Sequence, residues 1–282
     1  MSVTIPRACV MGHPVAHSRS PMVHGHWLKT LGLPGTYELA DVPEAEFPRF
    51  LTSLRARGYA GGNITVPHKE AAFRTVDRRD DAAEAIGAVN TVWYENDQLV
   101  GGNSDAYGFI AHLAASLPAW DESTRRCVVL GAGGAARAIA FALVARGVDV
   151  AVVNRTFARA RDVAMHFARA SAHAWDELPG LLARADLLVN ATSLGMSGKP
   201  ALAIDLAPLR RDAIVYEIVY VPLETALLRD ARSRGHRTVD GLGMLLHQAV
   251  PGFARWFGVM PTVTPELRAL IEADIRAKSG SV

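Results

Sequence analysis

A glycine-rich turn between two apolar runs constrains the fold of this chain more than any other feature. The apolar run Cys127–Leu130 leads into the segment GAGGAA at 131–136. A helical pattern follows over 137–146, and a second apolar run covers Val148–Val153. This order of strand, turn, helix and strand is the unit that binds the pyrophosphate of a dinucleotide at the start of its helix. We therefore expect a parallel sheet with helices on its faces around this segment.

The residues of the turn have distinct predicted roles. Gly131 permits the tight turn, Gly133 lets the backbone approach the phosphates, and Ala136 is small enough for close packing of helix on strand. The amides at the helix start, with the positive end of the helix dipole, attract the anion. A tight turn without a ligand is the alternative, but the two flanking strands favour a cofactor site.

The end of the second strand indicates which dinucleotide is bound. An NAD site usually has a carboxylate there, which holds the ribose 2′-hydroxyl and would repel a 2′-phosphate. This chain has Asn154 at that position, followed by Arg155, Thr156 and Arg159. Arginine offers a fixed fork of charged donors that suits a phosphate group. The sequence therefore predicts NADP, with NADPH as its reduced form, in preference to NAD.

The composition restricts the other classes of partner. The chain has 282 residues, is 50% hydrophobic and carries a formal net charge of +2, so it can form a large core and should not attract nucleic acid or an acidic membrane. No signal-peptide core or apolar run of membrane-spanning length is found. Cys9 and Cys127 lie in apolar runs, which predicts buried free thiols in a cytoplasmic protein. The histidines at 13, 17, 24 and 26 match no common zinc spacing, so no metal site is expected.

The alternation of strand and helix patterns predicts two domains. We expect an α/β protein in which residues 1–105 and 241–282 form a substrate domain and 106–240 form a Rossmann-like NADP domain with a parallel sheet. Strands of the NADP domain are expected near 127–130, 149–153, 186–190, 213–218 and 236–239. The C-terminal helices, predicted over 244–257 and 265–278, would pack on the substrate domain.

The first 105 residues have their own alternating pattern. Strands are predicted over 8–11, 37–42 and 59–65, with a hairpin over 91–101 that turns at Asn96-Asp97. Helices are predicted over 21–31, 44–57, 80–88 and 106–117, and another is expected to start at Pro67. Ser20 is the expected N-cap of the first helix, ahead of a proline at the first helical position.

Four polar clusters lie at or near the carboxyl ends of strands in this first part, where open α/β sheets bind ligands. They cover residues 12–21, 63–69, 87–91 and 102–105. Ser18 and Ser20 can bind a carboxylate as neutral donors, and Asn63, Asn90 and Asp105 can bind ring hydroxyls. Together the clusters supply hydroxyls, amides, one amine and one carboxylate. These are the groups expected in a site that binds a small polyol acid. Roles as helix caps or turn residues are the alternative for several of them.

The usage of lysine singles out Lys69. Only four of the 30 basic residues are lysine, so arginine is the usual cation of this chain. An amine can give up its proton, whereas a guanidinium effectively cannot. The charge of Lys69 is also expected in the first turn of a helix, where the dipole is unfavourable for a cation. These two observations favour a chemical role for Lys69 over a structural one.

With these motifs described, the chain resembles the shikimate dehydrogenase family over residues 7–270. The matching segments are HSRSP at 17–21, NITVPHK at 63–69, GAVNT at 87–91, GAGGA at 131–135, NRT at 154–156, NATSLGM at 190–196 and DGLGML at 240–245. The resemblance implies a discontinuous substrate domain around a central NADP domain. It also implies the reversible, NADP-dependent reduction of 3-dehydroshikimate to shikimate in aromatic amino-acid biosynthesis.

The resemblance further implies roles for individual residues. Lys69 and Asp105 would form the catalytic pair, with Lys69 as proton donor and acceptor, and the ammonium makes a metal unnecessary. Substrate contacts are implied for Ser18, Ser20, Asn63, Thr65, Asn90, Asp105, Tyr220 and Gln248. Cofactor contacts are implied for Gly131, Gly133, Gly134, Ala135, Asn154, Arg155, Thr156, Arg159, Thr192, Ile218 and Gly241. Closure of a cleft between the domains would exclude water during the reaction.

Two positions depart from the family pattern. Ser104 stands where the family often has threonine, and it keeps the hydroxyl beside Asp105. Gly25 stands where asparagine is frequent, and this change removes no residue assigned to chemistry. The paired serines at 18 and 20 favour shikimate over quinate.

Alternative functions stay open at this point. A dual-specificity quinate/shikimate dehydrogenase is one, and a non-catalytic NADP-binding sensor is another. The sensor would be expected to lack the pair of Lys69 and Asp105, which this chain has. Folate-linked or tRNA-linked reductases would not predict these polar clusters. A small-molecule substrate is expected, and both a monomer and a homodimer are compatible with the sequence.

Overall fold

The computed structural model describes residues 5–279, which form two compact units. Of the described residues, the first unit comprises 5–104 together with Leu246–Ile271. The second unit comprises Asp105–Leu245 and 272–279. Helix α11 (Leu242–Phe257) begins in the second unit and ends in the first, and α12 (Pro265–Ser279) begins in the first and ends in the second. Both helices were predicted at nearly these bounds.

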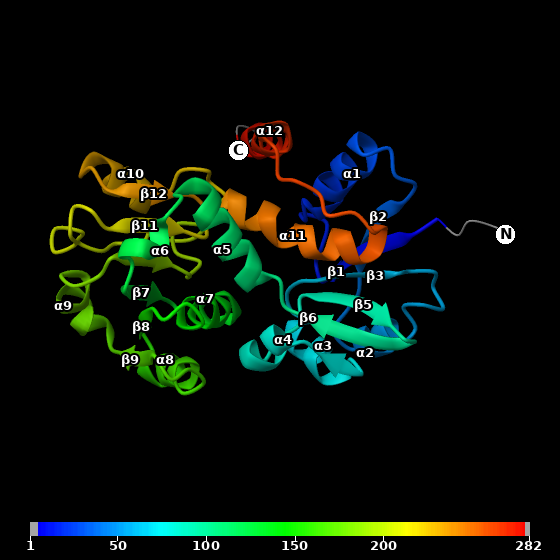
Figure 1. Ribbon diagram of the computed structural model, residues 1–282, viewed down its shortest axis with the longest axis horizontal. Helices are drawn as coiled ribbons and strands as arrows, with labels where there is room; N and C mark the ends of the chain where they lie inside the picture. Colours follow the sequence, from blue (N-terminus) through cyan, green and yellow to red (C-terminus); the bar gives the residue numbers. More distant parts are fainter. Residues whose placement is uncertain (1–4, 280–282) are drawn as a thin grey trace. The chain divides into compact units, whose positions relative to one another are not determined.

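A six-stranded mixed sheet forms the centre of the first unit, with strand order β2-β1-β3-β5-β6-β4 (Figure 1). The strands are β1 (Arg7–Gly12), β2 (Thr36–Asp41), β3 (Gly61–Ile64), β4 (Arg78–Arg79), β5 (Thr91–Glu95) and β6 (Gln98–Gly102). β1 pairs in parallel with β2 and β3, whereas the β3–β5 and β5–β6 pairs are antiparallel. The predicted hairpin is confirmed, with Asn96 and Asp97 at φ 48° and 65°, as a tight two-residue turn requires. β4 was not predicted, because two residues carry no periodicity.

The helices of the first unit correct several predictions. They are α1 (Ser20–Thr30), α2 (Phe47–Thr52), α3 (Lys69–Thr75) and α4 (Asp81–Ile86). The N-cap of α1 is Arg19, so the prediction that Ser20 caps this helix was wrong; Ser20 is its first residue and donates its backbone amide to Ser18 Oγ at 3.3 Å. α3 begins at Lys69 instead of Pro67, because His68 N donates to Thr65 O in a turn that precedes the helix.

The prediction of a helix over 44–57 was also wrong in its length. α2 ends at Thr52, where the hydroxyls of Thr52 and Ser53 donate back to the carbonyls of Pro48 and Arg49 at 3.1 Å and 2.9 Å. Such side-chain bonds compete with the continuation of the helical ladder. The chain then passes through turns to Gly58, which has φ 84°.

Strand β1 of the first sheet is buried on both faces. Cys9 and Met11 of β1 pack with Phe47 and Leu51 of α2, whereas Ala8 and Val10 pack in a second cluster that includes Trp256 of α11. Trp256 Nε1 donates to Val92 O at 2.9 Å, which fixes α11 against β5. Continuous burial of β1 explains its uninterrupted apolar run.

The second unit contains a parallel sheet with the order β12-β11-β10-β7-β8-β9. The strands are β7 (Arg126–Leu130), β8 (Asp149–Val153), β9 (Ala170–His173), β10 (Leu187–Asn190), β11 (Ile214–Glu217) and β12 (Arg237–Val239). The helices are α5 (Asp105–Ser116), α6 (Trp120–Ser123), α7 (Gly134–Val144), α8 (Phe157–Ala164), α9 (Leu178–Leu182) and α10 (Ala226–Ser233), with a 3₁₀ turn at Trp175–Glu177. This is the doubly wound order of dinucleotide-binding sheets, so the predicted Rossmann-like sheet is confirmed. Only β9 escaped prediction, because this short edge strand has no apolar run.

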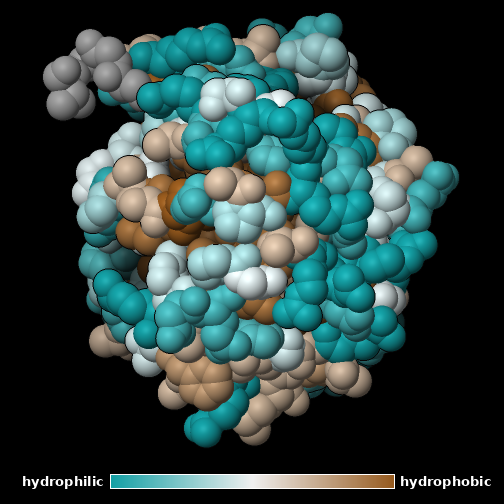
Figure 2. Space-filling model, turned by 90° about the vertical axis from the view of Figure 1, so that its left-hand side faces the viewer, coloured by the Kyte–Doolittle hydropathy of each residue, from teal (hydrophilic) through white to brown (hydrophobic). Residues whose placement is uncertain are grey.

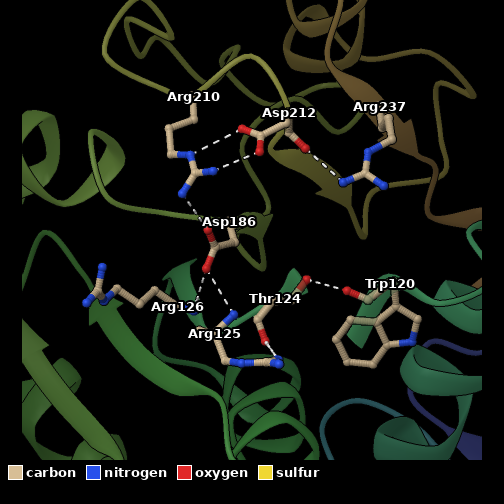
Figure 3. Close-up of polar contacts among 8 residues, drawn as sticks. All are labelled: Trp120, Thr124, Arg125, Arg126, Asp186, Arg210, Asp212 and Arg237. Carbon is tan, nitrogen blue, oxygen red and sulfur yellow. Dashed lines mark hydrogen bonds and ion pairs between the residues drawn. The ribbon is translucent and has the colours of Figure 1, made fainter. Parts of the chain in front are cut away.

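The amino ends of these strands are joined by a cluster of ionic contacts, which we call the amino-end cluster: Asp186, Arg210, Asp212 and Arg237 (Figure 3). The Asp186 carboxylate accepts from the backbone amides of Arg125 and Arg126 at 2.9 Å each and from Arg210 Nη1 at 3.1 Å. Arg210 also binds the Asp212 carboxylate, and Arg237 Nη2 donates to Asp212 O at 2.8 Å. The cluster thereby links the starts of β7, β10, β11 and β12.

Several sequence-based expectations concern the surface and the cysteines. Cys9 and Cys127 are free and buried, as predicted. Within residues 5–279 no helix is long and apolar enough to cross a membrane, and no group of His, Cys, Asp or Glu side chains there is arranged to hold a metal ion. Figure 2 shows one face of the molecule, where hydrophilic residues surround a hollow in which hydrophobic residues are exposed.

Candidate functional site

Predicted substrate residues of the first unit meet in one buried hydrogen-bond network. Asn63, on β3, accepts from Tyr37 OH at 2.7 Å through its side-chain oxygen. Its side-chain nitrogen donates to Asn90 O at 3.2 Å and to Thr91 Oγ1 at 3.1 Å. Asn63 and Asn90 are 6% and 3% exposed, so their amides are held in fixed orientations by these bonds.

The network continues through Ser104 to helix α11. Asn90 Oδ1 accepts from Thr91 Oγ1 at 2.9 Å and from Ser104 N at 2.8 Å. Ser104 Oγ lies 3.2 Å from Asn90 Oδ1 and 3.5 Å from Gln248 Oε1. The Ser104 hydroxyl therefore lies among the predicted substrate residues, directly before Asp105 in the chain. A threonine at this position would have the same group.

Tyr37 is bonded to the predicted substrate residue Asn63, and the sequence did not single it out. Burial raises the pKa of Tyr37 well above its ordinary value, and hydrogen bonds to Ser20 and Asn63 act in the opposite direction. The phenol is therefore neutral and connects the predicted carboxylate site to the predicted hydroxyl site. Tyr37 stands in an ordinary strand pattern, where an aromatic residue signals a core position.

The His24 ring packs against the face of the Tyr37 ring. The two rings stack with centroids 4.0 Å apart and planes inclined by 15°. Burial lowers the pKa of His24 to about 3, against a smaller opposing effect of Asn63. His24 is therefore an uncharged packing residue.

The two predicted carboxylate-binding serines lie at the start of α1. Ser18 Oγ donates to Ser20 Oγ at 3.3 Å, and both side chains are half-buried. Hydroxyls arranged in this way offer neutral donors beside a helix N-terminus, where an anion is favoured.

Lys69 is the first residue of α3 and is half-buried. The residue before it is fixed, because the His68 ring stacks on Phe47 at 4.1 Å and its Nε2 lies 2.7 Å from Val42 O. The backbone carbonyl of Lys69 accepts from Val89 N at 3.0 Å. These contacts of His68 and of the Lys69 carbonyl thus connect the chain around Lys69 to the segments next to β2 and β5.

Thr65 is held between β3 and α3. Its amide donates to Met11 O at 2.9 Å, and its methyl group lies 2.4 Å from where a Cβ on Gly12 would stand. A glycine is therefore required at position 12 for this approach.

The remaining predicted site residues belong to the second unit. Asp105 is the half-buried first residue of α5, and Tyr220 is half-buried in the loop after β11. The structure therefore assigns the members of the predicted catalytic pair, Lys69 and Asp105, to different units.

The glycine-rich turn has the geometry that a pyrophosphate requires. Gly131 has φ 107°, and a Cβ there would stand 2.8 Å from Ala191 O, so only glycine fits. Gly133 is the N-cap of α7, and no atom lies within 4 Å of the Cβ position of Gly133 or Gly134. Ala135 follows in the first turn of α7, whose amides have no partner in a preceding turn. Open space over free helix-start amides fits an anionic cofactor group.

The end of β8 carries the predicted phosphate-binding residues. Asn154 Nδ2 donates to Thr156 O at 2.9 Å and shapes the turn into α8. Arg155 and Arg159 are exposed, and no ion pair with either arginine is found among the described residues. Their charge is therefore available to a 2′-phosphate group.

A third group surrounds the ends of β10 and β11. Thr192 Oγ1 donates to Asn190 Oδ1 at 2.7 Å in the loop after β10. Gly241 approaches the chain so closely that its Cβ would stand 2.3 Å from Ile218 O. The three groups together fit NADP: glycines where the backbone must be open, arginines where a phosphate must be held, and a polar loop on the other side of β7.

Comparison with known families identifies both parts of the chain. Residues 10–92 match the family model described as the shikimate dehydrogenase substrate binding domain. Residues 113–197 match the model described as shikimate / quinate 5-dehydrogenase. The match to the first model covers Tyr37, Asn63 and Asn90 of the polar network, and the match to the second covers the glycine-rich turn.

Full-length relatives give the same result. A shikimate dehydrogenase (NADP(+)) of Brucella abortus (strain S19) is 56% identical over 281 residues, which cover 98% of this chain and 96% of the relative. The structure of shikimate 5-dehydrogenase from Thermus thermophilus in complex with NADP(H) and shikimate has a TM-score of 0.84 at 39% identity, covering 96% and 99% of the two chains. Quinate dehydrogenase from Corynebacterium glutamicum in complex with NAD has a TM-score of 0.87 at 31% identity, covering 95% and 99%.

Proposed function

The chain belongs to the shikimate dehydrogenase family, and we propose that it reduces 3-dehydroshikimate reversibly to shikimate with NADPH, a step of aromatic amino-acid biosynthesis. The observation that carries this proposal is the buried network of Tyr37, Asn63, Asn90 and Ser104 beside a half-buried lysine. A site of fixed amides and hydroxyls binds a substrate rich in hydroxyls and rejects analogues that lack them.

The substrate is held by residues of opposite character at its two ends. Ser18 and Ser20 bind its carboxylate, and Tyr220 contributes to the same end. Asn63, Asn90 and Asp105 bind the ring hydroxyls, and Thr65 and Gln248 complete the contacts. The buried bonds of Asn63 and Asn90 leave their amides in one orientation, so little reorganisation is needed when the substrate binds.

Proton transfer is the task of Lys69. When bound, NADPH supplies the hydride that the ketone carbon receives. The ketone oxygen then gains negative charge, which the Lys69 ammonium stabilises before it donates its proton to that oxygen. Asp105 holds the amine and a substrate hydroxyl in the required geometry. In the oxidative direction the neutral amine accepts the same proton.

Cofactor binding is divided among three segments of the second unit. Gly131, Gly133, Gly134 and Ala135 would hold the pyrophosphate, because the start of α7 favours an anion. The 2′-phosphate of the adenosine end binds Asn154, Arg155, Thr156 and Arg159. Thr192, Ile218 and Gly241 would contact the other half of the cofactor.

The replacement Lys69→Ala tests the proposed role of the lysine. This variant should bind NADPH normally, yet its turnover of 3-dehydroshikimate should fall by about 10²-fold or more, because the proton donor is missing. Lys69→Arg should fail as well, since a guanidinium retains its proton. Initial rates of NADPH oxidation and a fluorescence titration of NADPH measure both quantities.

A matched control for this experiment is Lys29→Ala, which removes an exposed lysine from α1. Its turnover should equal that of the parent protein. Normal turnover in Lys69→Ala would exclude Lys69 from the chemistry, and an active Lys69→Arg variant would show that the proton comes from another group.

The likeness to quinate dehydrogenase from Corynebacterium glutamicum favours one second candidate, a dual-specificity enzyme that also accepts quinate. Rates of shikimate and quinate oxidation, each with NAD and NADP, distinguish the two functions. The non-catalytic sensor is disfavoured, because both Lys69 and Asp105 are present.

We also place the protein in the cytoplasm. Its buried free thiols, Cys9 and Cys127, fit a reducing compartment. The oligomeric state, monomer or homodimer, stays a prediction that size-exclusion chromatography can test.

A further inference from the structure

A fully buried carboxylate lies at the carboxyl end of the second sheet, and the proposed reaction does not use it. Glu217 is the last residue of β11, and its register partner Asn190 is the last residue of β10. Both side chains are 0% exposed. Because paired residues of parallel strands project to the same face, the carboxylate and the amide meet there.

Neutral donors surround this carboxylate. Asn190 Nδ2 donates to the two oxygens of Glu217 at 2.9 Å and 3.0 Å. Val219 N donates to Oε1 and Thr225 Oγ1 donates to Oε2, each at 3.0 Å. Over residues 5–279 no cation forms an ion pair with Glu217. Burial raises the pKa of Glu217, and these donors oppose the shift.

The hydrogen-bond partners of Glu217 belong to two loops, so the Glu217 carboxylate holds both loops. Asn190 also donates to Leu194 O at 3.1 Å and accepts from Thr192 N at 3.1 Å, which fixes the loop after β10. Thr225 caps α10 and ends the loop after β11. Two adjacent loops of the sheet therefore share one buried anchor.

Backbone contacts join these two loops to each other and to the segment at Gly241. Gly195, in the first loop, has φ 91°, and a Cβ there would stand 4.0 Å from Glu217 Oε2. Ser197 N donates to Val221 O at 2.8 Å, which joins the two loops directly. Gly241 packs against Ile218 O, as described above. The proposed contacts Thr192, Ile218, Gly241 and Tyr220 all lie on these segments.

The order of the sheet shows which half of the cofactor these loops serve. β8, which carries the proposed 2′-phosphate residues, lies on one side of β7, and β10 and β11 lie on the other side. A dinucleotide binds across the carboxyl ends of such a sheet, with its pyrophosphate at the central turn. The loops anchored by Glu217 therefore face the nicotinamide half.

We propose that Glu217 is a positioning residue, whose carboxylate fixes the loops of Thr192 and Tyr220 relative to each other and thereby places the nicotinamide ring against the substrate. The inference rests on the proposed function. Glu217 itself is fully buried and touches neither ligand, so it acts only through the loops that its partners belong to.

The replacement Glu217→Gln tests this role. The variant keeps the shape of the side chain but turns one acceptor into an NH₂ group that faces the donors of Asn190 or Thr225. For shikimate oxidation with NADP, kcat/KM should fall by about 10- to 100-fold, since small displacements of reacting groups are costly. Adenosine 2′,5′-bisphosphate, which lacks a nicotinamide, should bind as tightly as it binds the parent protein in isothermal titration calorimetry.

A matched control lies one residue earlier on the same strand. Tyr216→Phe removes a buried hydrogen bond, between Tyr216 OH and His112 Nδ1 at 2.8 Å, without touching either loop. Both variants should melt at a lower temperature than the parent, yet only Glu217→Gln should lose kcat/KM. Equal kcat/KM in Glu217→Gln and the parent overturns the inference. Loss of bisphosphate binding in parallel with activity also overturns it, because that pattern indicates a general loss of structure.

If Glu217→Gln does not fold, Thr225 provides a second test. Thr225→Val removes the hydroxyl that donates to Glu217, whereas Thr225→Ser keeps it. Lower kcat/KM in the valine variant alone supports the inference, and equal values in the two variants overturn it. Absence of shikimate oxidation by the parent protein would instead contradict the proposed function.

Discussion

Each end of the second sheet has a carboxylate between adjacent strands, and the two ends stabilise that carboxylate in opposite ways. At the amino end, Asp186 is 16% exposed and binds Arg210, whose side chain is 50% exposed (Figure 3). At the carboxyl end, Glu217 is 0% exposed, and all its hydrogen-bond donors within residues 5–279 are neutral. One end has charges of both signs in contact with water, and the other has one charge enclosed by the protein.

The difference indicates which end of the sheet tolerates substitution. Exposed ion pairs contribute little to stability, because water and salt screen them. A buried carboxylate is tolerated only when its oxygens accept hydrogen bonds. The position of each donor around Glu217 is therefore constrained. Ligands bind at the carboxyl ends of such sheets. We infer that the amino-end cluster tolerates substitution, whereas the Asn190–Glu217 pair is constrained by the site.

The largest effect that separates the two ends is expected for Asn190→Leu. This change removes two bonds to a buried carboxylate and should lower the free energy of unfolding by about 3 kcal/mol. Arg210→Ala, at the amino end, should lower it by much less, since its ion pairs are half-exposed and screened by water. Urea unfolding followed by circular dichroism measures both values. Equal losses would show that burial does not distinguish the ends.

A second prediction concerns the arginines of the two ends. Arg155, at the carboxyl end of β8, has no ion pair among the described residues, whereas Arg210 has two acidic partners. Arg155→Ala should raise the dissociation constant of NADP by about 10- to 100-fold, the effect of one charged hydrogen bond, and should leave that of NAD unchanged. Arg210→Ala should change neither constant. If Arg155→Ala weakens NAD and NADP equally, the 2′-phosphate is not bound there.

Much of the carboxyl end could be predicted from the sequence, because its signals are local. The glycines at 131 and 133 and the arginine at 155 follow directly on apolar runs, and the structure has strand, turn and helix at these positions. The hairpin at Asn96-Asp97 was equally clear. Local signals failed where side chains compete with the backbone, as at Ser20 and at the end of α2.

Glu217 and Tyr37 could not be assigned from the sequence, because their environments depend on strand pairing. Tyr37 reaches Asn63 only because β2 and β3 both pair with β1 in one register. Glu217 reaches Asn190, which is 27 positions earlier in the sequence, only because β10 and β11 are paired neighbours. A glutamate at the end of an apolar run predicts an exposed strand end, and nothing local indicates that it is enclosed.

The smallest predicted effect compares the two ends through their pH dependence. Arg210 holds the pKa of Asp212 below its ordinary value of 3.8, chiefly through their hydrogen bonds. The stability that Asp212 contributes is therefore present above that value and is lost as the pH falls through the lowered pKa. Because Asp212 is exposed, Asp212→Asn should cost at most about 0.5 kcal/mol near neutral pH and should leave shikimate oxidation unchanged.

Glu217 should give the opposite sign. Burial raises its pKa above the ordinary 4.5, so the folded protein binds this proton more tightly than the unfolded chain does. The stability of the parent relative to Glu217→Gln should be highest below 4.5 and should fall as the pH rises through the raised pKa. Urea unfolding of the parent and both variants over a series of pH values gives the two slopes. Slopes of the same sign would mean that the carboxylates at the two ends of the sheet experience the same electrostatic environment, which contradicts the distinction between an open and an enclosed end.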